Sequence, residues 1–293
     1  MATDCTDFTY AGAGIRESVD FLYNASMKAL MDFMGHFGIR PEASAPRLLE
    51  NVVTAFSSLP YENITKIIKR AESGSLEKAR RYPEEVIRDH IAWGAGGTCF
   101  SLTYALLHLV RGLGWKAECI LADRKYGQDT HCALLVWING VPHLLDPGFL
   151  VVRPVPLSGT CGQEIDTAFN RLGLEPEGKP GRISLSTVRG GVRTYRLSYK
   201  TSPVDEGEFF KAWDASFGWD MMRYPLLTRT EGARQIYLRG SRLQVSGAGS
   251  VEKRILAGED LVSRIAAEFR MDASVVARAV SLLEDKGEKY GKA

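Results

Sequence analysis

The stretch that most restricts the fold is THCALLVWINGVPHLLDPGFL, residues 130–150. Two apolar runs flank Asn139-Gly140, the pair of residues most typical of a two-residue β-hairpin turn. With this turn, Ile138 pairs with Val141, and the two numbers of every further pair sum to 279. Because a two-residue turn fixes the register of both strands, the sequence predicts an antiparallel hairpin with a defined face for each side chain.

This register brings a histidine and an aspartate together. His131 lies opposite Gly148 and Asp146 lies opposite Ala133, so the two polar side chains point to the same face. They are diagonal neighbours, roughly 7–8 Å apart at the backbone, a separation that side chains can span. Taken singly, a packed strand histidine and a turn aspartate are the simpler interpretations. Taken together, the two residues predict an imidazole–carboxylate pair.

A cysteine opens the helix that is predicted just before the hairpin. Residues 94–115 read GAGGTCFSLTYALLHLVRGLGW, and the apolar spacing predicts an amphipathic helix from Cys99. Its inward-facing stripe consists of Cys99, Leu102, Leu106, Leu109 and Leu113. In the first turn, free N–H groups and the helix dipole stabilise a thiolate, and Gly96 and Gly97 leave room for a substrate carbonyl. The competing interpretation is a buried structural cysteine.

Together these residues predict a catalytic triad. A thiolate nucleophile needs a base, and the base needs a group that orients it. We expect Cys99 as nucleophile, His131 as base and Asp146 as the orienting carboxylate. Backbone N–H groups of Cys99 and Phe100 are expected to hold an oxyanion. The other histidines lie at helix ends, on the far side of the Cys99 helix or on the far face of the hairpin: His36, His90, His108 and His143. A zinc site built from the triad residues is the weaker alternative, and we expect no metal.

The remaining pattern predicts helices first and strands later. Helical spacing covers residues 16–38, 44–60 and 82–93, and β-type runs follow the Cys99 helix. Residues 173–182, rich in glycine, proline and charge, have the composition of a linker. A short helix over 207–217, two helices near the end and a charged tail complete the chain. This order predicts an α+β fold rather than alternating α/β.

Composition is that of an ordinary globular protein and argues against several partners. The 293 residues carry 37 basic and 35 acidic side chains, spread along the whole chain, for a net charge of +2. This balance gives no electrostatic basis for binding nucleic acid or an anionic membrane. The N-terminus has neither the basic nor the apolar region of a secretory signal. Five scattered cysteines fit reduced thiols, so we expect a cytoplasmic protein.

Five short motifs follow one another at suitable spacing: LPYENIT (59–65), GGTCF (96–100), THCALLV (130–136), LLDPGF (144–149) and RPVPL (153–157). Together they resemble the arylamine N-acetyltransferase family, within the wider transglutaminase-like superfamily of cysteine enzymes. The resemblance is strongest over 50–160 and continues weakly towards the C-terminus. It implies a papain/transglutaminase-like catalytic core with a Cys–His–Asp triad, which maps onto Cys99, His131 and Asp146.

The resemblance also implies three domains and an acyl-transfer reaction. The implied domains are a helical one over 1–115 that carries the cysteine, a β-barrel over 116–205 that carries the histidine and aspartate, and an α/β lid over 206–293. The implied reaction moves an acyl group, in this family acetyl, from acyl-CoA to a small-molecule amine through an acyl-cysteine intermediate. Acetyl-CoA or another acyl-CoA is then a co-substrate, and no tightly bound cofactor is implied.

Several residues differ from the family's usual pattern. The arginine that usually precedes the two glycines is Ala95, and the usual glutamate two residues after the cysteine is Ser101. Pro147 and Leu150 replace residues near the cofactor loop. Glu62 remains, and we expect it to lack its usual arginine partner.

The acceptor pocket is expected to include Phe100, Gly148 and Phe149, although both phenylalanines fit a core position equally well.

Two alternative functions keep the triad and change the reaction. A transglutaminase-like amidase or peptidase attacks an amide, and an amide synthase uses a polyketide-type acyl chain. A binding module with a relic site is a third interpretation, disfavoured because all three triad residues are intact.

Overall fold

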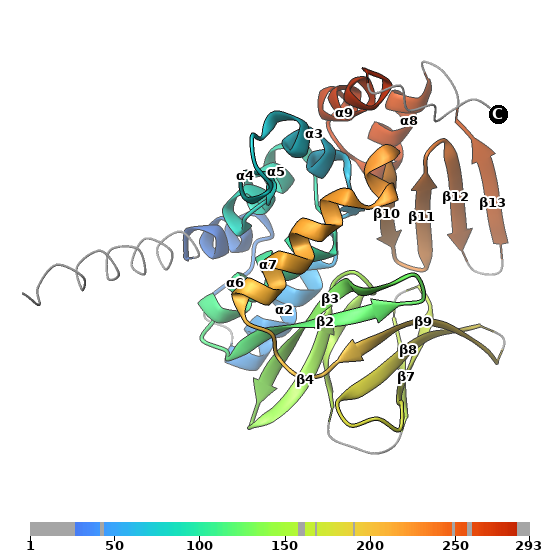
Figure 1. Cartoon of the computed structure of the whole chain (residues 1–293). Coiled ribbons are helices and arrows are strands. Elements are labelled where there is room, and N and C mark those ends of the chain that lie inside the picture. Colours follow the sequence, from blue (N-terminus) through green and yellow to red (C-terminus); the bar gives the residue numbers. More distant parts are fainter. Residues whose placement is uncertain are drawn as a thin grey trace, which may run out of the picture.

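The computed structural model describes residues 27–41, 44–157, 162–167, 169–189, 191–247, 250–256 and 260–285. Its strands form two antiparallel sheets, and helices pack against both (Figure 1). This is a mixed fold of helices and antiparallel sheets, and that part of the α+β prediction is confirmed. The start of the first predicted helix (16–26) and the charged tail (286–293) lie outside the described residues.

The larger sheet has eight strands: β2 (Ala117–Arg124), β3 (Gly127–Ile138), β4 (Val141–Asp146), β5 (Val151–Pro156), β6 (Gln163–Asp166), β7 (Arg171–Pro176), β8 (Arg182–Arg189) and β9 (Val192–Lys200). Their order across the sheet is β5-β4-β3-β2-β9-β8-β7-β6. The sheet curls (Figure 1), and among the described residues no pairing joins its edge strands β5 and β6. Strand β7 shows that the linker prediction for 173–182 was wrong in its first half, because Leu172 and Leu174 bury their side chains inside the curl.

The smaller sheet has five strands: β1 (Tyr61–Glu62), β10 (Leu226–Glu231), β11 (Arg234–Arg239), β12 (Arg242–Gly247) and β13 (Ser250–Ile255). They lie in the order β1-β10-β11-β12-β13. The edge strand β1 comes from the N-terminal third of the chain, and Tyr61 pairs with Thr228 of β10. The first and last thirds of the sequence are therefore joined by backbone pairing beside the predicted site.

The helices of the described chain cover residues 27–36, α2 (Ala45–Phe56), α3 (Ile64–Glu72), α4 (Leu76–Ala79), α5 (Pro83–Trp93), α6 (Cys99–Gly112), α7 (Glu206–Ala215), α8 (Asp260–Phe269) and α9 (Ala273–Asp285), with short 3₁₀ turns η1 (Ser216–Gly218) and η2 (Asp220–Arg223). The sequence pattern missed α3 and α4, which are short. Ser44 stands at the start of α2 as predicted, but its side chain caps no N–H group. Within the described residues, no helix has the length and apolar character that crossing a membrane requires.

The predicted hairpin register is confirmed. Strands β3 and β4 pair from Ile138 with Val141 to Leu134 with Leu145. Asn139 and Gly140 have φ angles of 51° and 78°, the left-handed conformation that a type I′ turn requires at both central positions. The turn residues thus set the face of every side chain on both strands.

Strands β2 and β3 are buried on both faces, and alternate residues enter two different cores. One set packs against the helices: Cys119, Leu121, Cys132, Leu134 and Val136. The other set fills the inside of the curled sheet: Ile120, Ala122, Ala133 and Leu135. By this alternation His131 belongs to the inner face, whereas the next residue, Cys132, faces the helices.

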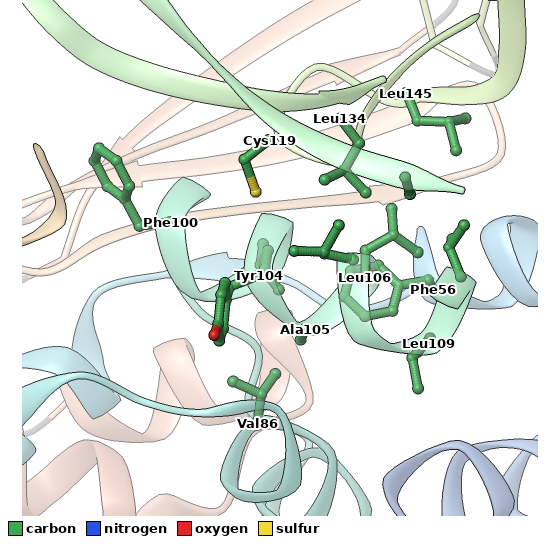
Figure 2. Close-up of a cluster of buried hydrophobic side chains, with 14 of the residues drawn as sticks. Phe56, Val86, Phe100, Tyr104, Ala105, Leu106, Leu109, Cys119, Leu134 and Leu145 are labelled. Atoms are coloured by element: carbon green, nitrogen blue, oxygen red, sulfur yellow. The ribbon is translucent and has the colours of Figure 1, made fainter. Parts of the chain in front are cut away.

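Helix α6 is buried on nearly all sides, so the predicted amphipathic stripe is too narrow. Besides Cys99 and the stripe residues Leu102, Leu106 and Leu109, the side chains of Phe100, Thr103, Tyr104, Ala105 and Leu107 are also buried, whereas Leu113 follows the helix and is half-buried. Figure 2 shows the cause, since Cys119 and Leu134 cover one side of the helix and Val86 lies on another. A helix enclosed in this way holds its first residue at a fixed position.

Glycine at position 94 is required by both conformation and space. Gly94 ends α5 with a φ of 65°, and a Cβ atom there would lie 2.1 Å from the carbonyl oxygen of Arg270. We expect Gly94→Ala to lower the free energy of unfolding by about 3 kcal/mol, through backbone strain and displacement of the Arg270 segment.

The matched control is Gly140→Ala, which has a φ of 78° but nothing within 4 Å of the added Cβ. It should cost about 1 kcal/mol from strain alone. Urea denaturation of both variants measures the difference, and equal losses would contradict the role assigned to the Arg270 contact.

Candidate active site

His131 and Asp146 form a buried pair at the position that the hairpin register predicts. Both side chains have 0 % exposure, and Nε2 of His131 lies 2.6 Å from Oδ2 of Asp146. The other carboxylate oxygen, Oδ1, accepts hydrogen bonds from the backbone N–H groups of Gly148 at 2.8 Å and Phe149 at 3.1 Å. The turn after β4 therefore fixes the carboxylate, and the carboxylate fixes the imidazole ring.

Tyr199 completes the set of donors around Asp146, and the sequence pattern did not single it out. Its hydroxyl donates to Oδ2 of Asp146 at 2.6 Å. Ala122 of β2 pairs with Tyr199 of β9 on one side and with His131 of β3 on the other, so the three share one face. Because the Ala122 side chain is small, the tyrosine can reach across β2. Only the long-range pairing of β2 with β9 places Tyr199 beside Asp146, and no local sequence pattern predicts that pairing.

The mutual attraction and hydrogen bonding of His131 and Asp146 outweigh the effect of burial on the pKa of each residue. Burial raises the pKa of Asp146, but the charge and hydrogen bond of His131, with donors Tyr199 and Phe149, hold the pKa of the carboxyl below its ordinary value. Burial lowers the pKa of His131, yet the neighbouring Asp146 carboxylate and the Cys99 sulfur raise it above its ordinary value. The arrangement favours an imidazolium beside a carboxylate.

The Cys99 thiol lies at the start of α6 and is 2 % exposed, and its neighbours Cys132 and His131 shift its pKa. The hydrogen bond from the Cys132 thiol lowers the pKa of Cys99, burial opposes it, and His131 lowers it further, to well below the ordinary value. Thr98, at the N-cap, makes no side-chain cap, which leaves the first-turn N–H groups of the helix for an anion. The structure thus brings Cys99, His131 and Asp146 together.

Cys132 and Arg124 are two further neighbours that the sequence pattern missed. Cys132 follows His131 but points to the helix side of β3, and for this reason it meets Cys99. Arg124 reaches His131 from the bulge at the end of β2, with Nη2 3.2 Å from Nδ1. Its guanidinium also lies 5.5 Å from the centre of the Phe149 ring. A neutral His131 with its proton on Nε2 would accept a hydrogen bond from Arg124 at Nδ1.

The glycines before Cys99 serve close backbone packing rather than substrate access. A Cβ atom on Gly96 would lie 1.8 Å from the carbonyl oxygen of Pro60, and one on Gly97 would lie 2.3 Å from Oγ of Ser101. Gly97 also accepts a hydrogen bond from the N–H of Glu62 at 2.9 Å. The expected open approach at these glycines is therefore wrong, because Pro60 and Ser101 fill the space.

The expectation that Glu62 lacks an arginine is also wrong, because Arg81 occupies that place. All charged atoms involved are buried, and Nη1 of Arg81 lies 3.5 Å from Oε1 of Glu62. The same nitrogen donates to the carbonyl of Gly96 at 2.6 Å, and Nη2 donates to Asp89 at 2.8 Å. An arginine from the segment just before α5 thus holds the loop that leads to Cys99. Sequence spacing could not find it, since it lies outside the motif.

The predicted pocket residues have different surroundings. Phe100 has 0 % exposure and packs in an aromatic cluster with Phe209, Trp213 and Trp219, which is the core position that the sequence left open. Phe149 is half-buried with its ring 5.2 Å from that of His131. A Cβ on Gly148 would approach the His131 ring to 2.9 Å, so glycine there allows the turn to lie against the imidazole.

The remaining histidines lie away from this pair. Nδ1 of His90 lies 2.8 Å from the carbonyl oxygen of Ala95, and that of His143 lies 2.8 Å from the carbonyl oxygen of Val141. His108 packs on Tyr104 of the same helix. In the part of the chain that the structure describes, no group of three histidine, cysteine or carboxylate side chains is placed to hold a metal ion.

We expect Tyr199→Phe to lower the free energy of unfolding at pH 7 by about 1–2 kcal/mol, because a buried carboxylate loses a donor. Asp146 has a folded pKa below its unfolded one. Its carboxylate therefore stabilises the fold above the unfolded pKa, and this contribution is lost as pH falls through the folded pKa. The loss of unfolding free energy caused by Tyr199→Phe should therefore be smaller at about pH 3 than at pH 7. Urea denaturation at both pH values tests this, with Tyr195→Phe, an exposed residue of the same strand, as control.

Arg81→Met should be much more costly than Arg88→Met, although both arginines contact Asp89. Removing Arg81 leaves the buried carboxylate of Glu62 without its arginine and leaves Asp89 with only the exposed Arg88, a loss of about 3–5 kcal/mol. The Arg88 side chain is 66 % exposed, so its loss should cost under about 1 kcal/mol. Equal destabilisation in a urea titration would show that Arg81 does not hold the buried network.

Comparison with known proteins places this arrangement in a family. A sequence model of the family described as N-acetyltransferase matches residues 47–277. No curated protein matches the chain by sequence. The fold is similar to that of arylamine N-acetyltransferase from Mycobacterium abscessus, at 15% identity and a TM-score of 0.75 over 89% of this chain and 97% of that one.

Two further structures share the fold at a similarly low sequence identity. One is the Mycobacterium marinum arylamine N-acetyltransferase in complex with CoA, at 16% identity and a TM-score of 0.71 over 87% of this chain and 98% of that one. The other is a Bacillus cereus arylamine N-acetyltransferase with a Cys-His-Glu catalytic triad, at 17% identity and a TM-score of 0.66 over 83% and 98%. Since the family model spans most of the sequence and these structures share the fold, the chain belongs to the arylamine N-acetyltransferase family of enzymes.

Proposed function

We propose that this chain transfers an acyl group, in the first instance acetyl, from acyl-CoA to a small-molecule amine, with Cys99 as the covalent carrier. The observation that carries the proposal is the buried hydrogen bond between His131 and Asp146, together with the lowering of the Cys99 pKa by His131. The three residues supply a thiolate, a proton carrier and an orienting carboxylate. Membership of the N-acetyltransferase family supports acetyl as the group transferred.

The first half-reaction acylates Cys99. The thiolate attacks the thioester carbonyl, a bond forms from the Cys99 sulfur to the carbonyl carbon, and the carbonyl oxygen becomes an oxyanion. Collapse of this intermediate breaks the bond to the CoA sulfur, and the His131 imidazolium gives its proton to that sulfur. Free CoA leaves, and a neutral His131 stands beside an acyl-cysteine. The M. marinum relative in complex with CoA supports this donor.

The second half-reaction returns the site to its starting state. The amine nitrogen attacks the acyl-cysteine, and His131 accepts the proton that the nitrogen loses. The carbon–sulfur bond breaks, the amide leaves, and Cys99 is again a thiolate beside an imidazolium. Throughout, Asp146 keeps Nε2 of His131 engaged, so that the other ring nitrogen serves the proton transfers.

Backbone N–H groups in the first turn of α6 are suited to hold the oxyanion in both halves. Thr98 leaves this turn without a side-chain cap, so the amides of Cys99 and Phe100 have no competing side-chain acceptor from that residue. Phe149, half-buried against the His131 ring, and Gly148 beside it are the proposed acceptor contacts. The same machinery would serve an amidase, a peptidase or an amide synthase, and these remain outcomes of the test.

We also propose that the chain works as three units with the bounds 1–115, 116–205 and 206–293. The second contributes the His131–Asp146 pair from the curled sheet, and the first contributes Cys99 from α6. The backbone pairing of Tyr61 with Thr228 crosses between the first and third units. The third unit is therefore expected to steady the Cys99 loop as well as to cover the substrate.

Intact mass spectrometry after incubation with acetyl-CoA tests the proposal. We expect the unaltered chain to gain one acetyl group on a short time scale and to lose it when an arylamine is added. Cys99→Ala should gain none, because the nucleophile is gone. A set of longer acyl-CoA thioesters tested in the same way defines the donor.

The matched control is Cys119→Ala, since burial raises the pKa of that buried thiol to about 12 and leaves it unreactive. This variant should acylate as the unaltered chain does. If Cys99 is not acylated by any acyl-CoA but the unaltered chain releases ammonia or an amine from amide substrates, the reaction is amide hydrolysis rather than acyl transfer.

A further inference from the structure

Arg124 places a guanidinium against the second nitrogen of the His131 ring, and the proposed reaction gives it no role. The side chain reaches the ring from the bulge at the end of β2, with Nη2 3.2 Å from Nδ1 of His131. Nε2 of the same ring is held by Asp146 at 2.6 Å. The two nitrogens of the imidazole therefore have opposite neighbours, a carboxylate on one side and a cation on the other.

Arg124 has few other polar partners. Its Nη1 donates to the hydroxyl of Tyr126 at 3.1 Å, and its Nε is buried with no hydrogen-bond partner among the described residues. The ring of Phe149 lies 5.5 Å from the guanidinium carbon. Among the described residues no carboxylate lies within ion-pair distance of Arg124, whereas the preceding residue, Asp123, pairs with Arg182. The charge of Arg124 thus acts on the histidine without a carboxylate to neutralise it.

The contact at Nδ1 suits only one charge state of the imidazole. A guanidinium N–H is always a donor, so it needs a lone pair on Nδ1, which a neutral ring with its proton on Nε2 provides. An imidazolium has a proton on both nitrogens and would set one donor and one positive charge against another. Burial and Arg124 accordingly lower the pKa of His131, whereas Asp146 and Cys99 raise it.

The charge around His131 changes during the proposed reaction. In the free chain Cys132, His131 and Arg124 all lower the pKa of Cys99. Negative charge on the Cys99 sulfur then offsets the repulsion between the guanidinium and a protonated imidazole. Acylation converts that sulfur into an uncharged thioester, so one of the groups that raise the pKa of His131 is lost.

Four charged or titratable groups still surround His131 in the acyl-enzyme. Asp146 of β4 favours the imidazolium, and the Tyr199 hydroxyl of β9 donates to that carboxylate. Cys132 is the next residue of β3, and its buried thiol has a raised pKa and is neutral. Arg124 of β2 is the one cation of this set, and with burial it opposes protonation of the ring.

We propose that Arg124 is a positioning residue that holds His131 neutral in the acyl-enzyme, with the proton on Nε2 and a lone pair on Nδ1 for the incoming amine. The inference rests on the proposed function, in which the amine nitrogen gives its proton to His131. When the amine arrives, its N–H replaces that of Arg124 at Nδ1, and the guanidinium keeps its hydrogen bond to Tyr126. Arg124 acts through the imidazole, and its removal should impair the second half-reaction more than the first.

Nitrogen NMR of isotope-labelled Cys99→Ala tests the charge state of His131 directly, because this variant, like the acyl-enzyme, has no thiolate. We expect a neutral ring at about pH 8 with its proton on Nε2. Adding Arg124→Met should raise the pKa of His131 by about one unit, because a neighbouring cation is removed. Arg124→Gln should give the same shift, and Arg124→Lys a smaller one. Signals absent from His131→Gln identify the ring.

The second half-reaction gives an independent pH profile. Chain acetylated on Cys99 and freed of CoA is mixed with an arylamine at several pH values, and loss of the acetyl group is followed by intact mass. In Arg124→Met the fall of the rate on the acid side should lie about one pH unit higher, because His131 stays protonated to higher pH. Acylation at about pH 7 should change less than about threefold, since Cys99 and His131 respond to Arg124 in opposite ways.

The matched control is Lys125→Met, which removes the neighbouring cation. Lys125 is exposed and lies 5.7 Å from the ring of Tyr195 rather than against the histidine. This variant should move neither the pH profile of deacetylation nor the pKa of His131.

The outcomes separate the two proposals. If acetyl-Cys99 forms but Arg124→Met leaves both the pH profile and the pKa of His131 unchanged, the role of Arg124 is overturned and the acyltransferase proposal stands. A doubly protonated His131 in Cys99→Ala at about pH 8 also overturns that role, and this measurement needs no change at Arg124. An unaltered chain that forms no acetyl-Cys99 overturns both. Upward shifts of profile and pKa support the proposal, because a purely structural defect would lower the rate without moving the titration.

Discussion

The carboxylate of Asp146 is fully buried, and the site depends on the four hydrogen bonds that make its charge tolerable there. An isolated buried carboxylate would be strongly disfavoured. The N–H groups of Gly148 and Phe149 come from the turn after β4, the hydroxyl of Tyr199 from β9 and the imidazole from β3. These donors come from strands and a turn that are distant in sequence but adjacent in the curled sheet. The sheet must therefore be complete before the aspartate is satisfied, and the aspartate in turn orients His131.

A second buried network supports the other half of the site. Arg81 bridges Glu62, Asp89 and the carbonyl of Gly96, and so ties α5, β1 and the Cys99 loop together. The alanine at position 95 removes the arginine usual for the family, yet the buried Glu62 still meets a guanidinium. The structure thus retains the ion pair while its cation comes from another place in the chain. Comparison of the local motif alone predicts a Glu62 without an arginine, whereas Arg81 supplies that cation.

The contrast between these networks shows what a sequence can predict. Asn139-Gly140 fixes the register of one hairpin, and from that register His131 and Asp146 follow by alternation alone. Tyr199 and Arg81 depend on which distant strands and helices become neighbours, which local spacing does not encode. The linker composition of 173–182 misled for a related reason, since tertiary burial of Leu172 and Leu174 outweighed it.

Strand β1 has two residues, yet its position has a consequence for how the protein matures. Glu62 donates its N–H to Gly97 in the Cys99 loop, and its own strand pairs with Leu227 of β10. During synthesis Cys99 leaves the ribosome long before Leu227 does. Until Leu227 emerges, the Cys99 loop lacks the sheet against which it rests, so the nascent chain carries Cys99 without the backbone that positions it. The Cys99 loop therefore gains its final support only after most of the polypeptide has been made.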